Sequence, residues 1–378
     1  LSGVLANLTM LEVKDHISAE QDFVRSLDLS HLLLEGVLCF MLFAGSLNVK
    51  LQALEQQRWV ILSLAIGGTI IACVVTGLLS WVALAGLGLS LSLAYAFVFG
   101  ALIAPTDPIA ALAILGKVGL PPRLGAIITG ESLFNDGVGV VLFTMFLAIA
   151  MGTEQPTATG AVILFLREVV GGVLLGMVAA FVMHRMAAAT KAYSARIMVS
   201  IAVVTLGYGI ALQIEVSGPI AMVVTGLVVG NITLPKAPEA MRNKIEAFWE
   251  AIDGVLNSTL FVLIGLHVVL VDWLTPGPAL IAIAVCLVAR WISVFIPLTA
   301  LGGAHKLDAQ RIGLSNLLTW GGLRGGLALA MALSLPQGPE QTLILHMTFA
   351  VVAFSIIVQG LSIGRLFSPE MMRGLLRS

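Results

Sequence analysis

The sequence contains few charged residues, and this shortage excludes most classes of soluble protein. Charged side chains make up 11% of its 378 residues, whereas a soluble domain carries about 25%. A soluble fold of this length would need much more polar surface to cover its exterior. The mean hydropathy of +1.03 therefore predicts that lipid surrounds the chain. The net charge of −1 argues against nucleic acid as a partner.

Cysteine and recognisable catalytic patterns are also scarce. The three cysteines, Cys39, Cys73 and Cys286, lie in apolar runs and form no CxxC pair, so we expect neither a disulfide framework nor a zinc site. The HExxH, Ser/His and GxGD patterns of intramembrane proteases do not occur. We therefore expect a protein that is not an enzyme and that uses no cofactor.

Apolar segments, in contrast, are abundant. A membrane-spanning helix needs about 20 mostly apolar residues, and these segments lack the period of two that a membrane β-barrel would show. We therefore predict an all-α, polytopic membrane protein, in which Gly226 and Gly230 form a small-xxx-small face suited to close helix packing. About eleven candidate segments occur, at 31–48, 59–83, 90–116, 123–151, 161–187, 195–212, 217–231, 242–270, 278–301, 309–335 and 341–366.

The positions of lysine and arginine predict the orientation of these segments. Fifteen of the 20 basic residues follow odd-numbered segments, and the joins after even-numbered segments are mainly acidic. Short loops rich in Lys and Arg face the cytoplasm. We therefore expect a cell (inner) membrane protein with a cytoplasmic C-terminus and with loop 9–29 outside. The chain starts at Leu1 with a short apolar stretch, and we expect N-terminal helices that are missing from it.

Five charged residues stand out inside the apolar segments: Asp107, Glu131, Asp136, Arg290 and Arg324. A charge in the hydrocarbon core costs about 2.5 kcal/mol or more, so such residues normally face a cavity or a partner. These five residues are therefore the first candidates for a functional site.

The motif PTDP at 105–108 predicts a broken helix. Pro105 and Pro108 each remove a backbone donor and push the preceding residue toward an extended conformation. Unwound backbone at this depth is tolerated inside protein or beside a cavity, where its carbonyl groups can bind ions. Asp107 fits two roles that do not exclude each other, a cap for the helix that restarts at Pro108 and an ion ligand.

A second motif, GESLFNDG at 130–137, places four polar side chains on one helix. Ser132 and Asp136 are four residues apart and share a face. Glu131 and Asn135 share the adjoining face. The first pair offers a hydroxyl and a carboxylate, which are oxygen ligands that hard cations prefer, and the second pair can hold the geometry.

Arg324 lies in the motif WGGLRGG, where four flanking glycines weaken the helix. Its position in the second half of the chain mirrors PTDP in the first half. Two interrupted spans in corresponding halves indicate an inverted-repeat transporter. Because a buried arginine needs a carboxylate, we predict that Arg324 pairs with Glu131, and that Arg290 pairs with Asp253 or Glu250.

These motifs together resemble the NhaP/NHE-type monovalent cation/proton antiporters. The resemblance rests on GESLFNDGVGVVLF, with PTDP upstream and WGGLRGG far downstream, and it covers nearly the whole chain. It implies an antiporter fold with two broken, crossed helices in a core domain and a separate dimerisation domain. The core would comprise about 90–151 and 278–366, and the protein would be a homodimer.

On the matching positions, the resemblance also implies an ion site. Asp136 would hold either a proton or a cation. Asp107 and Ser132 would add side-chain oxygens as Na⁺ ligands, and Thr106 would add its main-chain carbonyl.

The same resemblance implies a supporting network. Asn135 would orient the site through Glu131, and Glu131 would bridge to Arg324. Ala44 departs from the pattern, because many family members carry a glutamate there. This departure puts a water-linked accessory ligand in doubt.

The resulting hypothesis is exchange of Na⁺, with Li⁺ and K⁺ as open alternatives, for H⁺ at Asp136. Asn135 cannot ionise, so we expect electroneutral exchange, although Asp107 could also titrate. The expected partners are Na⁺, H⁺, the lipid bilayer and a second copy of the chain. The alternative is an ion-coupled symporter of a small organic anion that binds Arg324, and an Arg324 without a partner would favour it.

Overall fold

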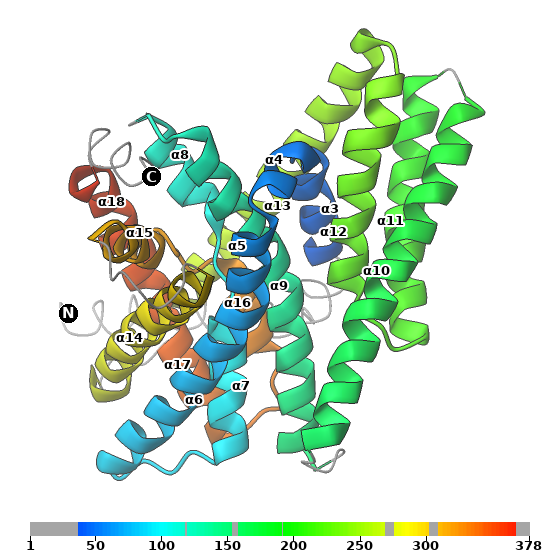
Figure 1. The fold of residues 1–378 in the computed structure, drawn as a ribbon. Coiled ribbons are helices and arrows are strands. Elements are labelled where there is room, and N and C mark those ends of the chain that lie inside the picture. Colours follow the sequence, from blue (N-terminus) through cyan, green and yellow to red (C-terminus); the bar gives the residue numbers. More distant parts are fainter. Residues whose placement is uncertain are drawn as a thin grey trace, which may run out of the picture.

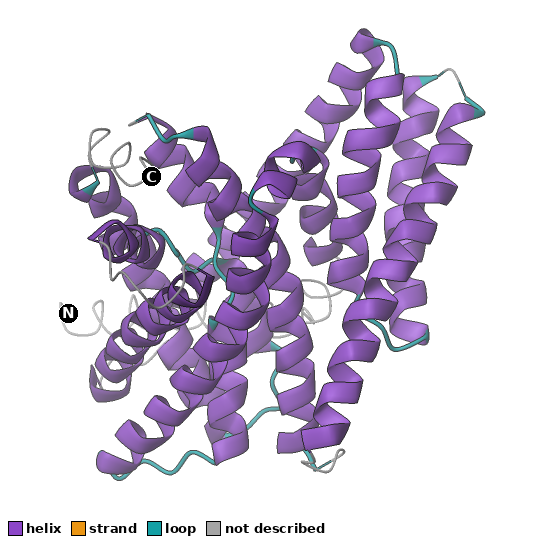
Figure 2. Ribbon diagram, viewed as in Figure 1, coloured by secondary structure: helices purple, strands orange, loops and turns teal. Residues whose placement is uncertain are grey.

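The computed structural model describes residues 37–117, 119–152, 158–190, 192–268, 276–301 and 309–367. Within these ranges the chain folds into helices joined by short loops, as Figure 2 shows. The prediction of an all-α protein is therefore confirmed. The N-terminal stretch, loop 9–29 and the start of segment 31–48 lie outside the described residues.

The helices follow the predicted segments closely. Each of the eleven segments contains helix where it is described, and the segments 90–116 and 309–335 are interrupted by non-helical residues. The first half of the chain contains α3 (Leu38–Leu47), α4 (Leu51–Gln56), α5 (Arg58–Leu62), η2 (Ser63–Gly68), α6 (Thr69–Gly86), α7 (Leu93–Ile103), α8 (Pro108–Lys117), α9 (Pro122–Ala150) and α10 (Ala158–Ala188). The second half contains α11 (Tyr193–Gln213), α12 (Gly218–Val228), η3 (Val229–Thr233), η4 (Leu234–Lys236), α13 (Glu239–Val268), α14 (Pro276–Leu301), α15 (Ala309–Trp320), α16 (Gly326–Leu333), α17 (Pro339–Phe354), η5 (Ser355–Gly360) and α18 (Leu361–Leu366).

Several of these helices are long and apolar enough to cross a membrane. By length and composition, seven helical stretches of the described chain meet that condition: Arg58–Gly86, Pro122–Ala150, Thr159–Ala188, Tyr193–Gln213, Gly218–Lys236, Pro276–Leu301 and Pro339–Leu366. The segments around α7–α8 and α15–α16 do not, because each is divided into two shorter helices. The chain is thus a multi-pass membrane protein.

The two divided segments meet at their interruptions. α7 ends at Ile103 and α8 begins at Pro108, while α15 ends at Trp320 and α16 begins at Gly326. Between them, the backbone N–H of Asp107 donates to the carbonyl of Leu323 over 2.7 Å. The PTDP and GGLRGG motifs therefore interrupt their helices where the sequence predicted, and the two interruptions touch.

Three apolar clusters surround this contact. One joins α6, α7, α9, α14, α16 and α17, the second joins α3, α9, α10, α11, α12 and α13, and a smaller third lies beside α8, α15 and α18. In Figure 1, α10, α11 and α12 stand together on one side, and α6, α7 and α14 to α18 lie on the other. α9 contributes to all three clusters and so connects the two sides.

The small-xxx-small face of Gly226 and Gly230 packs α12 and η3 against α3. A Cβ on Gly226 would collide with the side chain of Ser46, and a Cβ on Gly230 would collide with the backbone carbonyl of Leu47. The Asn231 amide follows directly and donates to the carbonyl of Val49 over 2.8 Å. These contacts attach α3, which forms part of the site described below, to the α10–α12 side.

We expect Gly230→Ala to destabilise the protein by about 1–3 kcal/mol, because the new methyl group must displace the Leu47 backbone. Thermal unfolding in detergent, followed by loss of monodisperse protein, measures this effect. Gly209→Ala is the matched control, since nothing lies within 4 Å of a Cβ at that position on α11. Equal melting temperatures for the two variants would contradict the close packing of α3 against η3.

Candidate functional site

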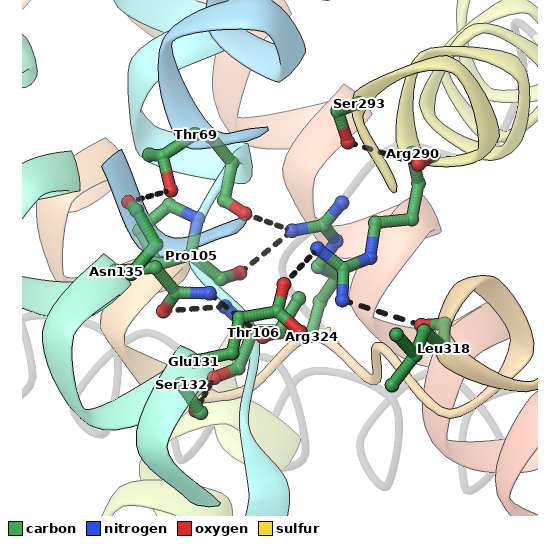
Figure 3. A network of polar contacts seen from close by, with 12 residues as sticks. Thr69, Pro105, Thr106, Glu131, Ser132, Asn135, Arg290, Ser293, Leu318 and Arg324 are labelled. Carbon is green, nitrogen blue, oxygen red and sulfur yellow. Dashed lines mark hydrogen bonds and ion pairs between the residues drawn. The ribbon is translucent and has the colours of Figure 1, made fainter. Parts of the chain in front are cut away.

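The polar residues of α9 hold the unwound backbone between α7 and α8. The Ser132 hydroxyl donates to the carbonyl of Thr106. The Asn135 side-chain amide donates to the Thr106 hydroxyl over 2.9 Å, and its oxygen accepts from the Thr106 N–H at 3.4 Å. Figure 3 shows these contacts converging on Thr106. The interrupted segment is therefore bonded to the neighbouring helix α9 at both its backbone and its side chain.

Arg324, which lies in the second interruption, donates hydrogen bonds to the unpaired carbonyls at the end of α7. Its Nη1 donates to the carbonyls of Ala104 and Pro105, the latter at 2.7 Å. Its own backbone N–H donates to the Ser355 hydroxyl over 2.8 Å. Arg324 is 5% exposed. A positive charge at a helix C-terminus is favourable, so Arg324 both bonds to and neutralises the end of α7.

The predicted pairing of Glu131 with Arg324 is wrong. Glu131 forms an ion pair with Arg290 instead, with Nη1 and Oε1 2.5 Å apart and both side chains buried. Arg290 Nη2 donates to the carbonyl of Leu318 at 3.2 Å. The physical reason is that Arg324 already donates hydrogen bonds to the unpaired carbonyls at the end of α7.

Two related predictions are also corrected. Arg290 does not pair with Asp253 or Glu250, because its carboxylate partner is Glu131. Asn135 does not act through Glu131 but bonds directly to Thr106. The adjoining face of α9 thus contacts the two interruptions through different residues. Asn135 bonds to Thr106 in the first interruption, and Glu131 pairs with Arg290, which bonds to Leu318 near the second.

The other face of α9 borders a cavity of about 290 Å³. Ser132 and Asp136 line it, together with Thr106 and Asp107 from the first interruption. Among the described residues, no hydrogen bond or ion pair engages the Asp136 carboxylate. The Asp107 carboxylate packs against Gly325, where a Cβ would lie 2.6 Å from its Oδ2. The structure therefore gathers the four predicted ligand residues around one cavity.

The opposite wall of the cavity adds polar residues that sequence analysis did not assign to the site. Glu250, Asp253 and Asn257 of α13 line it, and Asn48 joins them after the end of α3. They are three and four positions apart on α13, and this spacing in the sequence indicates that they share one face of the helix. Ala44 forms part of the same wall and is buried.

The lining of this cavity is acidic. Asp107, Asp136, Glu250 and Asp253 contribute carboxylates, and no lysine or arginine of the described chain lines it. A cleft lined by one sign of charge, with apolar walls, concentrates ions of the opposite sign. The cavity is thus suited to a small cation coordinated by oxygen atoms.

Comparisons with known proteins show the family and the fold of the chain. A family model described as "Sodium/hydrogen exchanger, transmembrane" matches residues 1–368. The Na(+)/H(+) antiporter NhaP of Pseudomonas aeruginosa is 42% identical over 352 residues, which cover 92% of this chain and 82% of that protein. The Na(+)/H(+) antiporter NhaH of Halobacillus aidingensis is 34% identical over 375 residues, covering 96% and 88% respectively.

A solved structure shows the same fold. The sodium proton antiporter MjNhaP1 from Methanocaldococcus jannaschii matches with a TM-score of 0.75 at 19% identity, covering 93% of this chain and 87% of that one. The chain thus has the fold of a helical membrane antiporter. The chain belongs to the sodium/hydrogen exchanger family.

The ion pair between Glu131 and Arg290 makes a prediction for stability. Glu131→Gln leaves a buried guanidinium without its counter-charge and should cost about 3–5 kcal/mol. Combining it with Arg290→Met should recover much of that loss. Thermal unfolding of the two single variants and the double variant gives the coupling energy.

Arg324→Met provides the comparison for this cycle. We expect the coupling between positions 131 and 290 to exceed the coupling between positions 131 and 324. A larger coupling to position 324 would contradict the pairing in the structure.

Proposed function

We propose that this chain exchanges Na⁺ for H⁺ across the membrane and that Asp136 is the residue that carries either ion. The observation that carries this proposal is the placement of Asp136 in an acidic cavity beside the interruption of a helix. Membership of the sodium/hydrogen exchanger family and the named activity of its antiporter relatives support the same function.

The proposed Na⁺ ligands are all oxygen atoms. Asp136 and Asp107 supply carboxylates, Ser132 supplies its hydroxyl, and Thr106 supplies its main-chain carbonyl. The Thr106 carbonyl accepts from Ser132 and keeps a second lone pair for an ion. The contacts of Asn135 and Arg324 hold this carbonyl and its neighbours in place before any ion arrives.

Exchange follows from competition at one carboxylate. A proton and a sodium ion each neutralise Asp136, so occupation by one excludes the other. Asn135, which bonds to Thr106, has no charge to add, and one proton would therefore be exchanged for one cation. Asp107 is the second carboxylate at the site, and the charge balance of transport tests whether it carries a proton as well.

Movement would require two parts, and the apolar clusters support such a division. We assign about 90–151 and 278–366 to a moving core, together with α6, whose residues join the same cluster as α7 and α14. The scaffold would comprise α10 to α12 with α3 and α13. The outer faces of α10 and α11 expose many large apolar side chains, and we place the homodimer contact there.

The proposed orientation keeps the C-terminus in the cytoplasm of an inner-membrane protein. Its support is the excess of basic residues after odd-numbered segments.

Symport of an organic anion through Arg324 gains no support from this geometry. Arg324 is buried against two backbone carbonyls and does not line the large cavity. An anion entering that cavity would meet four carboxylates.

The test of the proposed function is exchange in proteoliposomes. A pH-sensitive dye should report proton movement when Na⁺ is added to wild-type protein, and Asp136→Asn should abolish it, because the amide can neither bind nor release a proton. Addition of Li⁺ and K⁺ identifies which cations are accepted.

Two further outcomes decide the details of this experiment. A wild-type rate that does not change when a membrane potential is imposed supports one-for-one exchange, and a rate that follows the potential would show that more than one proton moves per cation. Full exchange by Asp136→Asn would remove that residue from the mechanism.

The acidic wall of α13 gives a separate prediction. Asp253→Asn should raise the KM for Na⁺ about fivefold at low salt, the effect of losing ~1 kcal/mol of attraction, and the difference should shrink at high ionic strength. Glu239→Gln is the matched control, because it removes an exposed charge from the start of the same helix. A KM unchanged by Asp253→Asn would mean that α13 does not attract the cation.

A further inference from the structure

Two buried polar atoms close to the site have no hydrogen-bond partner in the described chain. They are Nε of Arg290 and the hydroxyl oxygen of Thr319. The two residues are 5% and 7% exposed, respectively. Leaving a buried donor or acceptor unpaired costs about 1–3 kcal/mol, so native proteins almost always satisfy such atoms with protein or ordered water.

Both residues border the same small cavity behind the ion site. Its volume is about 10 Å³, and Arg290, Thr319, Arg324 and Gln359 form its polar lining. Gly322 keeps this edge of Arg290 open, because a Cβ there would lie 2.6 Å from Nε. A cavity of about 10–15 Å³ with two to four polar partners is the smallest that holds one water molecule.

We propose that one buried water molecule occupies this cavity and makes Thr319 a positioning residue for the exchange site. The water accepts from Arg290 Nε–H and bonds to the Thr319 hydroxyl. The third partner is the side-chain oxygen Oε1 of Gln359, because the side-chain nitrogen Nε2 already donates to the backbone carbonyl of Trp320. A cation is excluded from the cavity, because the guanidinium groups of Arg290 and Arg324 (Figure 3) would repel it. A halide ion is excluded because it is larger than the cavity.

The water would complete the fixation of Arg290. Its Nη1 is bound to Glu131 and its Nη2 to Leu318, and Nε is the remaining edge of the plane. Arg290 also borders a second small cavity, whose lining includes Thr106, Asp107 and Ser132. Without a partner for Nε, only the hydrogen bonds of Nη1 and Nη2 would hold the guanidinium, and it could rotate about them. That rotation would disturb the residues proposed as ion ligands.

A structure at a resolution that shows ordered water tests the proposal directly. Wild-type protein should show one peak within hydrogen-bonding distance of both Arg290 Nε and the Thr319 hydroxyl. The same peak should be absent in Thr319→Val and present in Thr319→Ser. A dry cavity in the wild type, or Arg290 Nε bonded to a protein atom, would overturn the proposal.

Transport kinetics test the positioning role, which rests on the proposed Na⁺/H⁺ exchange. Thr319→Val should raise the KM for Na⁺ about threefold to tenfold, somewhat below the effect typical of residues that contact a metal ligand directly. Thr319→Ser should restore the wild-type value. Ser315→Ala is the matched control, because its hydroxyl is also buried on α15 and has no partner in the described chain, but it lies outside this cavity.

The outcomes separate this proposal from the proposed function. A KM of Thr319→Val equal to that of Ser315→Ala would overturn the positioning role while exchange itself stands. Wild-type protein that moves no protons in response to Na⁺ would overturn the exchange function, and the water peak would still be decided by the structure. If Thr319→Val does not fold, the wild-type map and the Thr319→Ser kinetics decide.

Discussion

The carbonyl groups at the end of α7 require hydrogen-bond donors, because the helix stops among apolar residues where water cannot satisfy them. Arg324 supplies those donors from the second interruption, and Asp107 joins the two interruptions through its backbone. This interaction allows unwound backbone to persist inside the bundle. It also leaves the Thr106 carbonyl and the Asp107 carboxylate beside α9, where Ser132 and Asp136 face the same cavity.

The distribution of charge follows from this constraint. Arg324 is occupied by α7, so Glu131 is neutralised by the other buried arginine, Arg290. Both positive charges thereby lie behind the site, and neither lines the cavity. The carboxylates of the first interruption, of α9 and of α13 line the cavity instead. The arginines thus support the backbone and the helix α9, and the carboxylates line the cavity proposed for exchange.

Much of this architecture could be predicted from the sequence, because apolar length and proline position are local properties. The segments around 59–83 and 123–151 are helices, and PTDP interrupts its helix at 104–107. The spacing of Ser132 and Asp136 correctly placed both on the face that lines the cavity. These inferences needed no knowledge of how distant helices pack.

The pairing of buried charges could not be predicted in the same way. Glu131 had two candidate arginines, and the sequence does not show that the α7 carbonyls engage Arg324 first. Glu250 and Asp253 were considered only as partners of Arg290, because their place in the cavity depends on how α13 packs across from α9. Thr319 carried no signal at all, since an unpaired hydroxyl is visible only once its surroundings are known.

The central claim is that one carboxylate, Asp136, holds either a proton or a cation. Calorimetric titration of the purified protein with Na⁺, in buffers of different ionisation enthalpy, measures the protons released per ion bound. At a pH where the site is mostly protonated, we predict release of about one proton per Na⁺, and an apparent Kd for Na⁺ that falls as the pH rises. Asp136→Asn should lose this release. Sodium binding that releases no proton and does not depend on pH would contradict the account.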